Sequence, residues 1–396
     1  MRILLVTDHY PPAGGGLAVQ AQRHAERLSA RGHELAVLAA GVHDAGERAG
    51  GVEVVTAGLS FARIPRVYQE GSPAFHPPWP DPAFRRALAR LVARLRPDVV
   101  HVHGWSVLSA VSLPSPPPIV CTLHDYGLCC PKKSLVRHGQ TCAGGRGLRC
   151  LSCDSDDQPT PRRSALAAAL ELTVPVARRR VRRWLAVSDY VRERHLQAGL
   201  DPARVTVLPP LVDQPEAPVA PSPDAPYILY VGPGPEQRHK GRSVLLEAFA
   251  RLRGDGPRLV LVGGRDRLAD PGARIEDRGR LGGAALGAAF HGAAFAVVPS
   301  VWPDPCPAVA VEAMGAGRPV IASAAGGLPS IVQDGRSGLL VAPGDPEALA
   351  AAMRALIEDS GRRRAMGAAA LAGFERFRTE NVLPRLEAVY RDAAGD

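Results

Sequence analysis

The stretch PSVWPDPCPAVAVEAMGAGRPVIASAAGG, residues 299–327, contains the pattern from which we interpret the rest of the chain. An apolar run at 295–298 leads into it and predicts a short buried strand. A proline-rich loop at 299–307 follows, then small residues at 308–317 that predict a helix ending at a glycine, and another apolar run at 319–322. Strand, loop, helix and strand in this order form the unit of a parallel α/β sheet.

The loop at 299–307 is expected to lie where such sheets bind ligands, outside the carboxyl ends of the strands. The amino-terminal end of the next helix would carry a partial positive charge, which suits a phosphate group. Asp304 in the loop and Glu312 in the helix have seven residues between them, and both could accept hydrogen bonds from ribose or hexose hydroxyls. The spacing fits equally well with Asp304 capping the helix and Glu312 facing solvent.

This stretch resembles the donor site of the retaining glycosyltransferases of family 4, which have the GT-B fold. The family pattern is a Pro-Ser strand end, a Glu, seven further residues and then Glu-Ala-Met, followed by a Gly-x-Pro-Val-Val/Ile strand and Gly-Gly. The matching positions here are 299–300, 304, 312–314, 317–321 and 326–327. Asp304 departs from the pattern because it is one methylene shorter than Glu, and Ser330 replaces another frequent Glu.

The composition is that of a globular protein with room for two domains. The chain has 396 residues, of which 46% are hydrophobic, and a formal net charge of +9. This charge suits an anionic ligand or an anionic membrane surface, whereas no nucleic-acid-binding motif is recognisable. Neither a signal peptide nor a stretch of roughly 20 apolar residues is recognisable. We therefore expect a cytoplasmic protein, with peripheral contact to an anionic membrane as an open alternative.

The first half of the chain has the pattern of a doubly wound α/β domain. The apolar run at 2–7 predicts a central parallel strand, and a glycine-rich loop precedes a predicted helix at 17–30. Gly15 and Gly16 in this loop would let the backbone approach a ligand closely. In family 4 the corresponding loop, followed by a helix and the Gly-His-Glu found here at 32–34, lies near the transferred sugar and the acceptor.

Histidines end or follow the next two predicted strands, at 98–102 and 119–123. A histidine at the carboxyl end of a strand can hydrogen-bond a sugar hydroxyl or transfer a proton. His101 and His103 share one face, and for His101 we favour a structural role. His124 matches the histidine of the family's Thr-x-His motif, so it is the first candidate in this half of the chain.

Five of the seven cysteines lie between residues 129 and 153. A cytosolic cluster that contains a C-x-x-C pair favours metal binding over disulfides, and four thiolates would suit a structural zinc. The alternative, in which the cysteines are reduced thiols or form disulfides, is as well supported by the sequence as zinc binding. A similar insertion after the Thr-x-His motif occurs in a subset of the family. The candidate ligands are Cys130, Cys142, Cys150 and Cys153, with Cys129 as a substitute for Cys130.

The remaining sequence divides at a proline- and alanine-rich segment, 214–226, which we predict to be a linker. It separates an amino-terminal domain at 1–213 from a nucleotide-sugar-binding domain at 227–377. Residues 378–396 are expected to form a helix that returns to the first domain. Within the first domain, the basic stretch at 162–183 predicts a helix, and the apolar residues after position 204 predict a strand extending to 213.

Lys240 precedes Gly241 at the start of a predicted helix in the second domain, a natural position for a phosphate contact. It matches the Lys-Gly of the family pattern. Pro233 replaces the arginine that the family has after the preceding strand, and Arg238 could substitute for that arginine.

The resemblance implies two facing Rossmann-like domains with parallel sheets and a carboxyl-terminal crossover helix, the α/β architecture named GT-B. It also implies retaining transfer of a hexose from a nucleotide-diphosphate sugar, with a UDP-sugar favoured, to a hydroxyl of a glycan, a lipid-linked molecule or a natural product. No obligatory cofactor is expected. The catalytic candidates are His124, Lys240 and Asp304, and the donor-binding candidates are Gly15, Gly16, Arg238, Lys240, Pro307, Ala308, Val309 and Glu312.

Two departures from the family pattern, at Asp304 and Pro233, leave alternatives open. One is a non-catalytic two-domain protein that binds a sugar or nucleotide. The other is a sugar-phosphate epimerase or synthase with the same fold.

Overall fold

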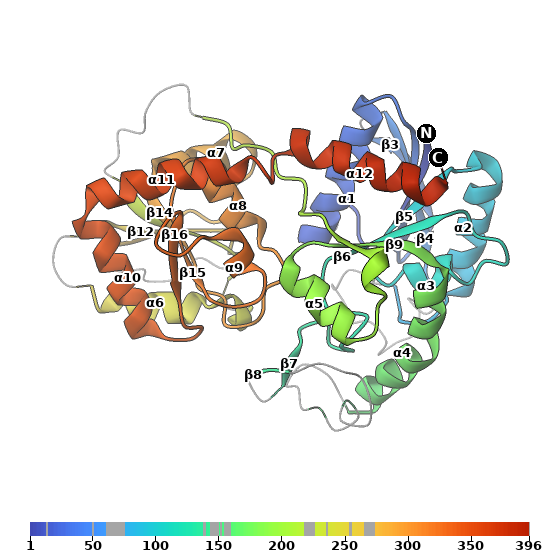
Figure 1. Ribbon diagram of the computed structural model, residues 1–396, viewed down its shortest axis with the longest axis horizontal. Helices are drawn as coiled ribbons and strands as arrows, with labels where there is room; N and C mark the ends of the chain where they lie inside the picture. Colours follow the sequence, from blue (N-terminus) through green and yellow to red (C-terminus); the bar gives the residue numbers. More distant parts are fainter. Residues whose placement is uncertain are drawn as a thin grey trace. The chain divides into compact units, whose positions relative to one another are not determined.

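The chain forms two compact units, each built on a sheet of its own. Unit 1 contains Met1–Leu211 and Val382–Asp396, and unit 2 contains Val212–Asn381 (Figure 1). The computed structural model describes residues 1–12, 15–49, 51–60, 76–137, 140–142, 150, 153, 160–217, 226–234, 237–252, 256–264 and 274–395. None of the helices in these ranges combines the length and apolar character that crossing a bilayer requires.

The sheet of unit 1 is parallel except at one edge. Its strand order is β10-β9-β6-β5-β1-β2-β4-β3, and only β3 runs antiparallel to its neighbour among these strands. The strands are β1 (Arg2–Thr7), β2 (Glu34–Gly41), β3 (Ala45–Ala49), β4 (Val52–Gly58), β5 (Val99–His103), β6 (Ile119–Leu123), β9 (Val181–Ala186) and β10 (Val205–Val207). The helices are α1 (Gly16–Ala30), α2 (Pro82–Leu95), α3 (Val107–Ala110), α4 (Thr160–Arg180), α5 (Asp189–Gln197) and, from the end of the chain, α12 (Thr379–Ala394).

The carboxyl-terminal helix α12 belongs to unit 1 because its apolar face completes the core there. Val382, Leu386 and Tyr390 are fully buried in the same cluster as the strand residues of β1 and β2. Burying side chains of this size stabilises the fold by about 1.5–3 kcal/mol each. The Arg31 guanidinium adds an ion pair to Glu387, with Nη2 and Oε2 separated by 2.9 Å. Figure 1 shows α12 beside α1.

Unit 2 has an entirely parallel sheet in the described residues, with the order β13-β12-β11-β14-β15-β16. The strands are β11 (Tyr227–Val231), β12 (Leu259–Val262), β13 (Ile275–Asp277), β14 (Ala293–Val298), β15 (Val320–Ser323) and β16 (Gly338–Val341). The helices are α6 (Arg242–Ala250), α7 (Gly283–Gly292), α8 (Ala308–Gly315), α9 (Leu328–Ile331), α10 (Pro346–Glu358) and α11 (Ser360–Phe374).

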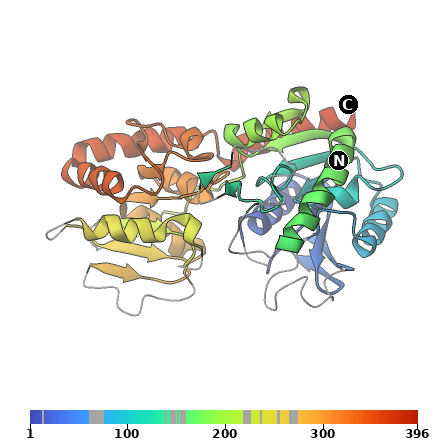
Figure 2. The same ribbon diagram turned by 90° about the horizontal axis from the view of Figure 1, so that it is seen from below.

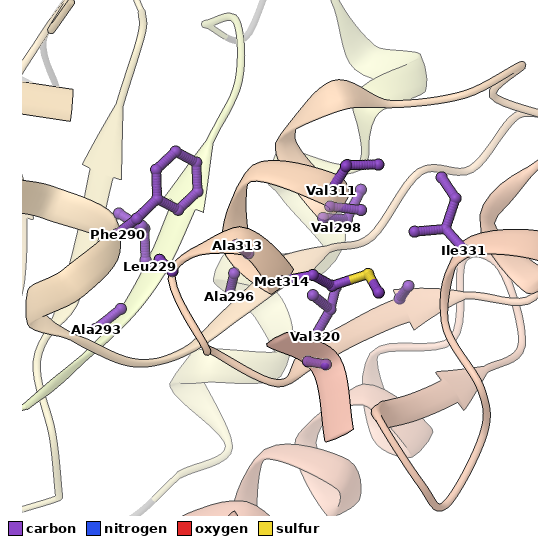
Figure 3. Packing of buried hydrophobic residues seen from close by; sticks show 14 of the residues in the cluster. Leu229, Phe290, Ala293, Ala296, Val298, Val311, Ala313, Met314, Val320 and Ile331 are labelled. Carbon is purple, nitrogen blue, oxygen red and sulfur yellow. The ribbon is translucent and has the colours of Figure 1, made fainter. Parts of the chain in front are cut away.

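Helices cover both faces of this sheet, which explains why its strands are continuous apolar runs. Along β14 the side chains alternate: Phe295 and Val297 enter one cluster, and Ala296 and Val298 enter the other. Figure 3 shows Met314 of α8 beside residues of β14 and β15 in the second cluster. In Figure 2 the yellow helix α6 lies along the face that carries the first cluster.

Two predictions about secondary structure in unit 1 were wrong. The helix predicted to reach residue 183 ends at Arg180, and β9 begins at Val181. Its backbone pairs with β6, so the gain from the sheet outweighs the helix propensity of the arginines. The strand predicted to extend to 213 ends at Val207. The predictions also missed β3, β4 and α2, which lie in the chain between β2 and β5.

Candidate functional site

Lys240 is held at the carboxyl edge of the sheet in unit 2 by a tight connection between β11 and α6. It ends the short 3-10 helix at Arg238–Lys240, and Gly241 follows with a φ of 74°. A Cβ atom at Gly241 would lie 1.8 Å from the carbonyl oxygen of Pro299. Only glycine therefore allows this connection to lie against the end of β14, where the proline-rich loop begins.

Asp304 lies in that loop and is 4% exposed. Its Oδ2 accepts hydrogen bonds from Lys240 Nζ at 2.6 Å and from Ser300 Oγ at 3.3 Å. Its backbone carbonyl accepts one from Gly327 N at 2.7 Å. A Cβ atom at Gly326, whose φ is 59°, would lie 2.2 Å from this carbonyl oxygen, so the Gly-Gly pair permits the close approach. The structure thus brings together two of the three catalytic candidates, Lys240 and Asp304.

The amino terminus of α8 has Pro307 at its N-cap position, and no side-chain hydrogen bond caps it in the described structure. The alternative in which Asp304 caps this helix is therefore wrong. Pro307, Ala308 and Val309 are partly exposed, and the first amides of a helix have no intrahelical acceptor. Glu312 is partly buried in the same helix. This end of α8 offers N–H groups and a partial positive charge to an anion.

Trp302 is a neighbour of Lys240 that the sequence analysis missed. Its ring lies edge-on to His239, with the ring centres 4.9 Å apart, and Lys240 Nζ lies 5.3 Å from its centre. An aromatic face at this distance attracts an ammonium group. The signal in the sequence was an aromatic residue inside a loop of prolines. Arg238 is exposed and lies in the same 3-10 helix as Lys240. Its contact with a diphosphate stays a prediction.

In unit 1, Gly15 and Gly16 form the start of α1, at the carboxyl edge of the sheet. Gly15 is the N-cap residue with a φ of 113°, and no side-chain hydrogen bond caps the helix in the described structure. Both glycines are exposed, and a Cβ atom on either would meet no described atom within 4 Å. Contact of this helix start with a ligand stays a prediction.

His124 follows β6 and contacts a histidine of the neighbouring strand β5. Its Nε2 lies 2.7 Å from His103 Nδ1, and the two rings are stacked with centres 5.0 Å apart. His101, two residues earlier on β5, has Nδ1 at 2.6 Å from the Tyr390 hydroxyl and Nε2 at 2.7 Å from Thr122 Oγ1. The structural role that we favoured for His101 agrees with these contacts.

The histidines of this cluster are neutral near pH 7. Burial lowers the pKa of His24 to about 4. Burial, with a smaller contribution from His24, lowers the pKa of His124 to about 3. The same cause lowers the pKa of His101 and of His103 well below the usual range. His124 therefore offers a ligand a neutral imidazole rather than a cation.

A second cluster that the sequence analysis missed surrounds Asp8, directly after β1. The buried carboxylate accepts backbone N–H bonds from Trp105 and Ser106, both at 2.8 Å. Lys133 Nζ lies 3.5 Å from Asp8 and 3.6 Å from Asp125. Although burial acts in the opposite direction, the pKa of Asp8 is lowered by Lys133, nearby histidines and the Trp105 amide. Lys133 thereby ties the cysteine-rich segment to the carboxyl edge of the sheet.

The four candidate zinc ligands are all described, and none of the seven cysteines forms a disulfide. Within the described residues, no group of three or more His, Cys, Asp or Glu side chains is placed to hold a metal ion. Cys130 is buried, and the other three, Cys142, Cys150 and Cys153, are partly exposed. The geometry thus does not assemble the tetrahedral site, and zinc binding stays a prediction.

Comparison with known proteins assigns both units to one family. A family model described as Glycosyltransferase Family 4 matches residues 14–214, and one described as Glycosyl transferases group 1 matches residues 225–359. A D-inositol 3-phosphate glycosyltransferase of Geodermatophilus obscurus is 31% identical over 357 residues, covering 79% of this chain and 71% of that protein. A glycogen synthase of Mycobacterium tuberculosis is 30% identical over 408 residues, covering 93% of this chain and 89% of that protein.

Solved structures share the architecture at lower identity. HepE of Anabaena, in complex with UDP, matches with a TM-score of 0.69 and 19% identity, covering 99% of this chain and 100% of that chain. Sucrose-phosphate synthase of Thermosynechococcus elongatus matches with a TM-score of 0.72 and 21% identity, covering 99% of each chain. These likenesses confirm the predicted GT-B fold. Because the family models match both units and relatives at 30% identity or more cover most of its length, the chain belongs to glycosyltransferase family 4.

Proposed function

We propose that this glycosyltransferase moves a hexose from a UDP-sugar to a hydroxyl acceptor, with retention of the anomeric configuration and without an obligatory cofactor. Family membership supports the reaction class. The choice of donor is supported by solved structures of HepE, a protein of the same fold, with UDP and with UDP-glucose. The observation that carries the proposal is the pair formed by Lys240 and Asp304 at the carboxyl edge of the sheet in unit 2.

On this proposal the donor's diphosphate binds between Lys240 and the amino terminus of α8. The ammonium group supplies a charge-assisted hydrogen bond, and the amides of Ala308 and Val309 supply N–H donors. Glu312, in the same helix, accepts hydrogen bonds from the ribose hydroxyls. Arg238 is the second cation within reach of the diphosphate.

Asp304 and Lys240 exchange partners when the donor binds. Without the donor, the carboxylate accepts hydrogen bonds from Lys240 and Ser300. A bound diphosphate would take the ammonium group as its own partner, which leaves Asp304 Oδ2 able to accept a hydrogen bond from a sugar hydroxyl. Because Asp304 is one methylene shorter than the family's Glu, we expect it to select a donor sugar whose hydroxyl reaches deeper into the loop.

The chemical step replaces one bond of the anomeric carbon by another. The bond from this carbon to the β-phosphate oxygen breaks, and a bond to the acceptor oxygen forms on the same face. The acceptor's proton passes to the departing UDP oxygen. Lys240 and the end of α8 stabilise the charge that develops on the diphosphate. Gly15, Gly16 and His124 are our candidates for contacts with the sugar and the acceptor.

The test is turnover of UDP-sugars by the purified chain. We expect slow release of UDP from one donor in water and faster release with a suitable acceptor, detected by mass spectrometry. Lys240→Ala should lower kcat/KM about 30- to 900-fold, which corresponds to about 2–4 kcal/mol of lost transition-state stabilisation. Arg251→Ala removes an exposed cation of the same unit, paired only locally with Glu247, and should leave kcat/KM unchanged.

Different outcomes separate the proposal from its alternatives. Wild-type rates in Lys240→Ala would contradict the role of Lys240. Saturable binding of UDP without release from any donor would instead support the non-catalytic binding protein. Interconversion of sugar phosphates without transfer to an acceptor would support an epimerase or synthase.

A further inference from the structure

His103 and His124 form a hydrogen bond through one shared proton. The atoms His103 Nδ1 and His124 Nε2 lie 2.7 Å apart. His103 is the last residue of β5, and His124 directly follows the neighbouring strand β6. Both imidazoles are neutral, and a neutral imidazole carries one N–H group and one bare nitrogen. One of the two facing nitrogens therefore donates and the other accepts.

Two arrangements satisfy this contact, and they give His124 opposite properties. In the first, His103 Nδ1–H donates to His124 Nε2, and His124 carries its own proton on Nδ1. In the second, His124 Nε2–H donates to His103 Nδ1, which leaves His124 Nδ1 bare and moves the proton of His103 to Nε2. The first makes the outward nitrogen of His124 a hydrogen-bond donor, and the second makes it a base.

The far side of His103 distinguishes the two arrangements. His103 is completely buried, and its Nε2 has no hydrogen-bond partner among the described residues. In the second arrangement this atom would be a buried N–H group without an acceptor. Orphaned buried N–H groups are rarer in proteins than under-satisfied acceptors, and a buried unsatisfied donor costs about 1–3 kcal/mol. In the first arrangement the same atom is only an unused lone pair.

The rings packed against His103 make their hydrogen bonds elsewhere, and neither forms one with His103 Nε2, although a neutral His24 keeps a bare Nε2. His24 has Nδ1 at 2.7 Å from the backbone carbonyl of Gln20, and this nitrogen must be the protonated one because a carbonyl only accepts. His101 uses both nitrogens, toward Tyr390 and Thr122. His124 itself is partly exposed, so water can satisfy its outer nitrogen in either arrangement. The asymmetry therefore arises at His103 alone.

We propose that His103 is a positioning residue that holds His124 as the Nδ1–H tautomer, so that His124 donates a hydrogen bond to a sugar or acceptor oxygen and does not remove a proton. The inference rests on the proposed function for the contact between His124 and the sugar or acceptor. It agrees with a reaction in which the acceptor's proton passes to the departing diphosphate, because His124 then has no bare outward nitrogen to receive it.

The tautomer can be measured directly, without turnover. Long-range 15N–1H correlation spectra of the full chain labelled at histidine distinguish protonated from bare ring nitrogens, and a His124→Asn variant assigns the signals. At pH 7.5 we expect His124 with a protonated Nδ1 and a bare Nε2. A protonated Nε2 on His124 in the wild-type spectrum would overturn the proposal.

Two substitutions of His103 then test its positioning role. His103→Leu removes the donor, and we expect an Nε2–H population of His124 to appear and kcat/KM to fall about 2- to 12-fold, as for the loss of one hydrogen bond. His103→Asn keeps an N–H donor near the same place and should restore the tautomer and most of the activity. A His124 tautomer that is unchanged in folded His103→Leu would also overturn the proposal.

A matched control and an independent readout separate this inference from the proposed function. His101→Leu changes a buried histidine of the same strand that has no hydrogen bond to His124, so the His124 tautomer should not change. If no UDP-sugar is turned over while His124 shows the expected tautomer, the proposed function fails and the assignment of the tautomer to His103 stands. If His103→Leu does not fold, the wild-type spectrum and His103→Asn still decide.

Discussion

Acidification from pH 7.5 to pH 5.5 should destabilise unit 1 much more than unit 2. Unit 1 buries His24, His101 and His103, each at most 4% exposed, and burial lowers the pKa of all three. In the unfolded chain these pKa values return to about 6.5. Unfolding therefore takes up protons as the pH falls below this value, so the stabilisation is complete above pH 6.5 and is lost toward the folded-state pKa.

The size of the effect follows from the unfolded-state pKa alone while the folded histidines stay neutral. At one pH unit below that pKa, each buried histidine lowers the free energy of unfolding by RT ln(11), about 1.4 kcal/mol. These three residues alone account for about 4 kcal/mol, a large part of the roughly 5–15 kcal/mol by which domains are stable, and His124, whose pKa burial also lowers, acts in the same direction. Unit 2 contains the histidines His239 and His291, and neither is fully buried.

Hydrogen exchange with mass spectrometry measures this difference within one molecule. After correction for intrinsic exchange rates, the slowest amides of β1, β5 and β6 should open at least about 1000-fold more often at pH 5.5, whereas those of β14 and β15 serve as the internal control. His24→Gln should reduce the change in unit 1 about tenfold, and His43→Gln, at an exposed position, should not alter it. A change below tenfold in unit 1, or equal changes in both units, would refute the reasoning.

Three further predictions concern the loop after β14 and the cysteines. Gly241→Ala should weaken UDP binding and destabilise unit 2 by more than the roughly 1–2 kcal/mol expected for Gly344→Ala. Both glycines have a φ near 75°, but only at Gly241 would the added Cβ atom clash with the carbonyl oxygen of Pro299. Equal melting temperatures of the two variants would contradict this. Asp304→Asn should tighten the binding of UDP alone, because Lys240 loses its anionic partner, and it should lower turnover. Calorimetry measures the affinity for UDP, with Asp345→Asn at a helix cap as the control, and an unchanged affinity in Asp304→Asn would contradict the prediction. Elemental analysis tests the zinc prediction made from the sequence: about one zinc per chain would support it, and no metal together with freely titrating thiols would leave the cysteines reduced.

Features that depend on short stretches could be predicted from the sequence. The apolar runs of β1 and β14, the small residues of α8 and the Gly-Gly pair at 326–327 all express local periodicity or turn chemistry. Strands that alternate with helices predict parallel sheets with loops at one edge, which placed Lys240 and Asp304 in neighbouring loops. The family pattern, which consists of the same local motifs, identified the fold class for the same reason.

Contacts between distant parts of the chain were decided only by the tertiary structure. Lys240 and Asp304 are 64 positions apart, and His103 and His124 are 21 apart, so their pairing depends on which strands become neighbours. The same dependence turned the basic stretch after Arg180 into β9, because its partner β6 lies far from it in sequence. The intrinsic propensity of a residue for helix or strand does not depend on which strands become neighbours in the sheet. The hydrogen-bond partners and pKa values of buried groups, in contrast, depend on which side chains the fold brings into contact.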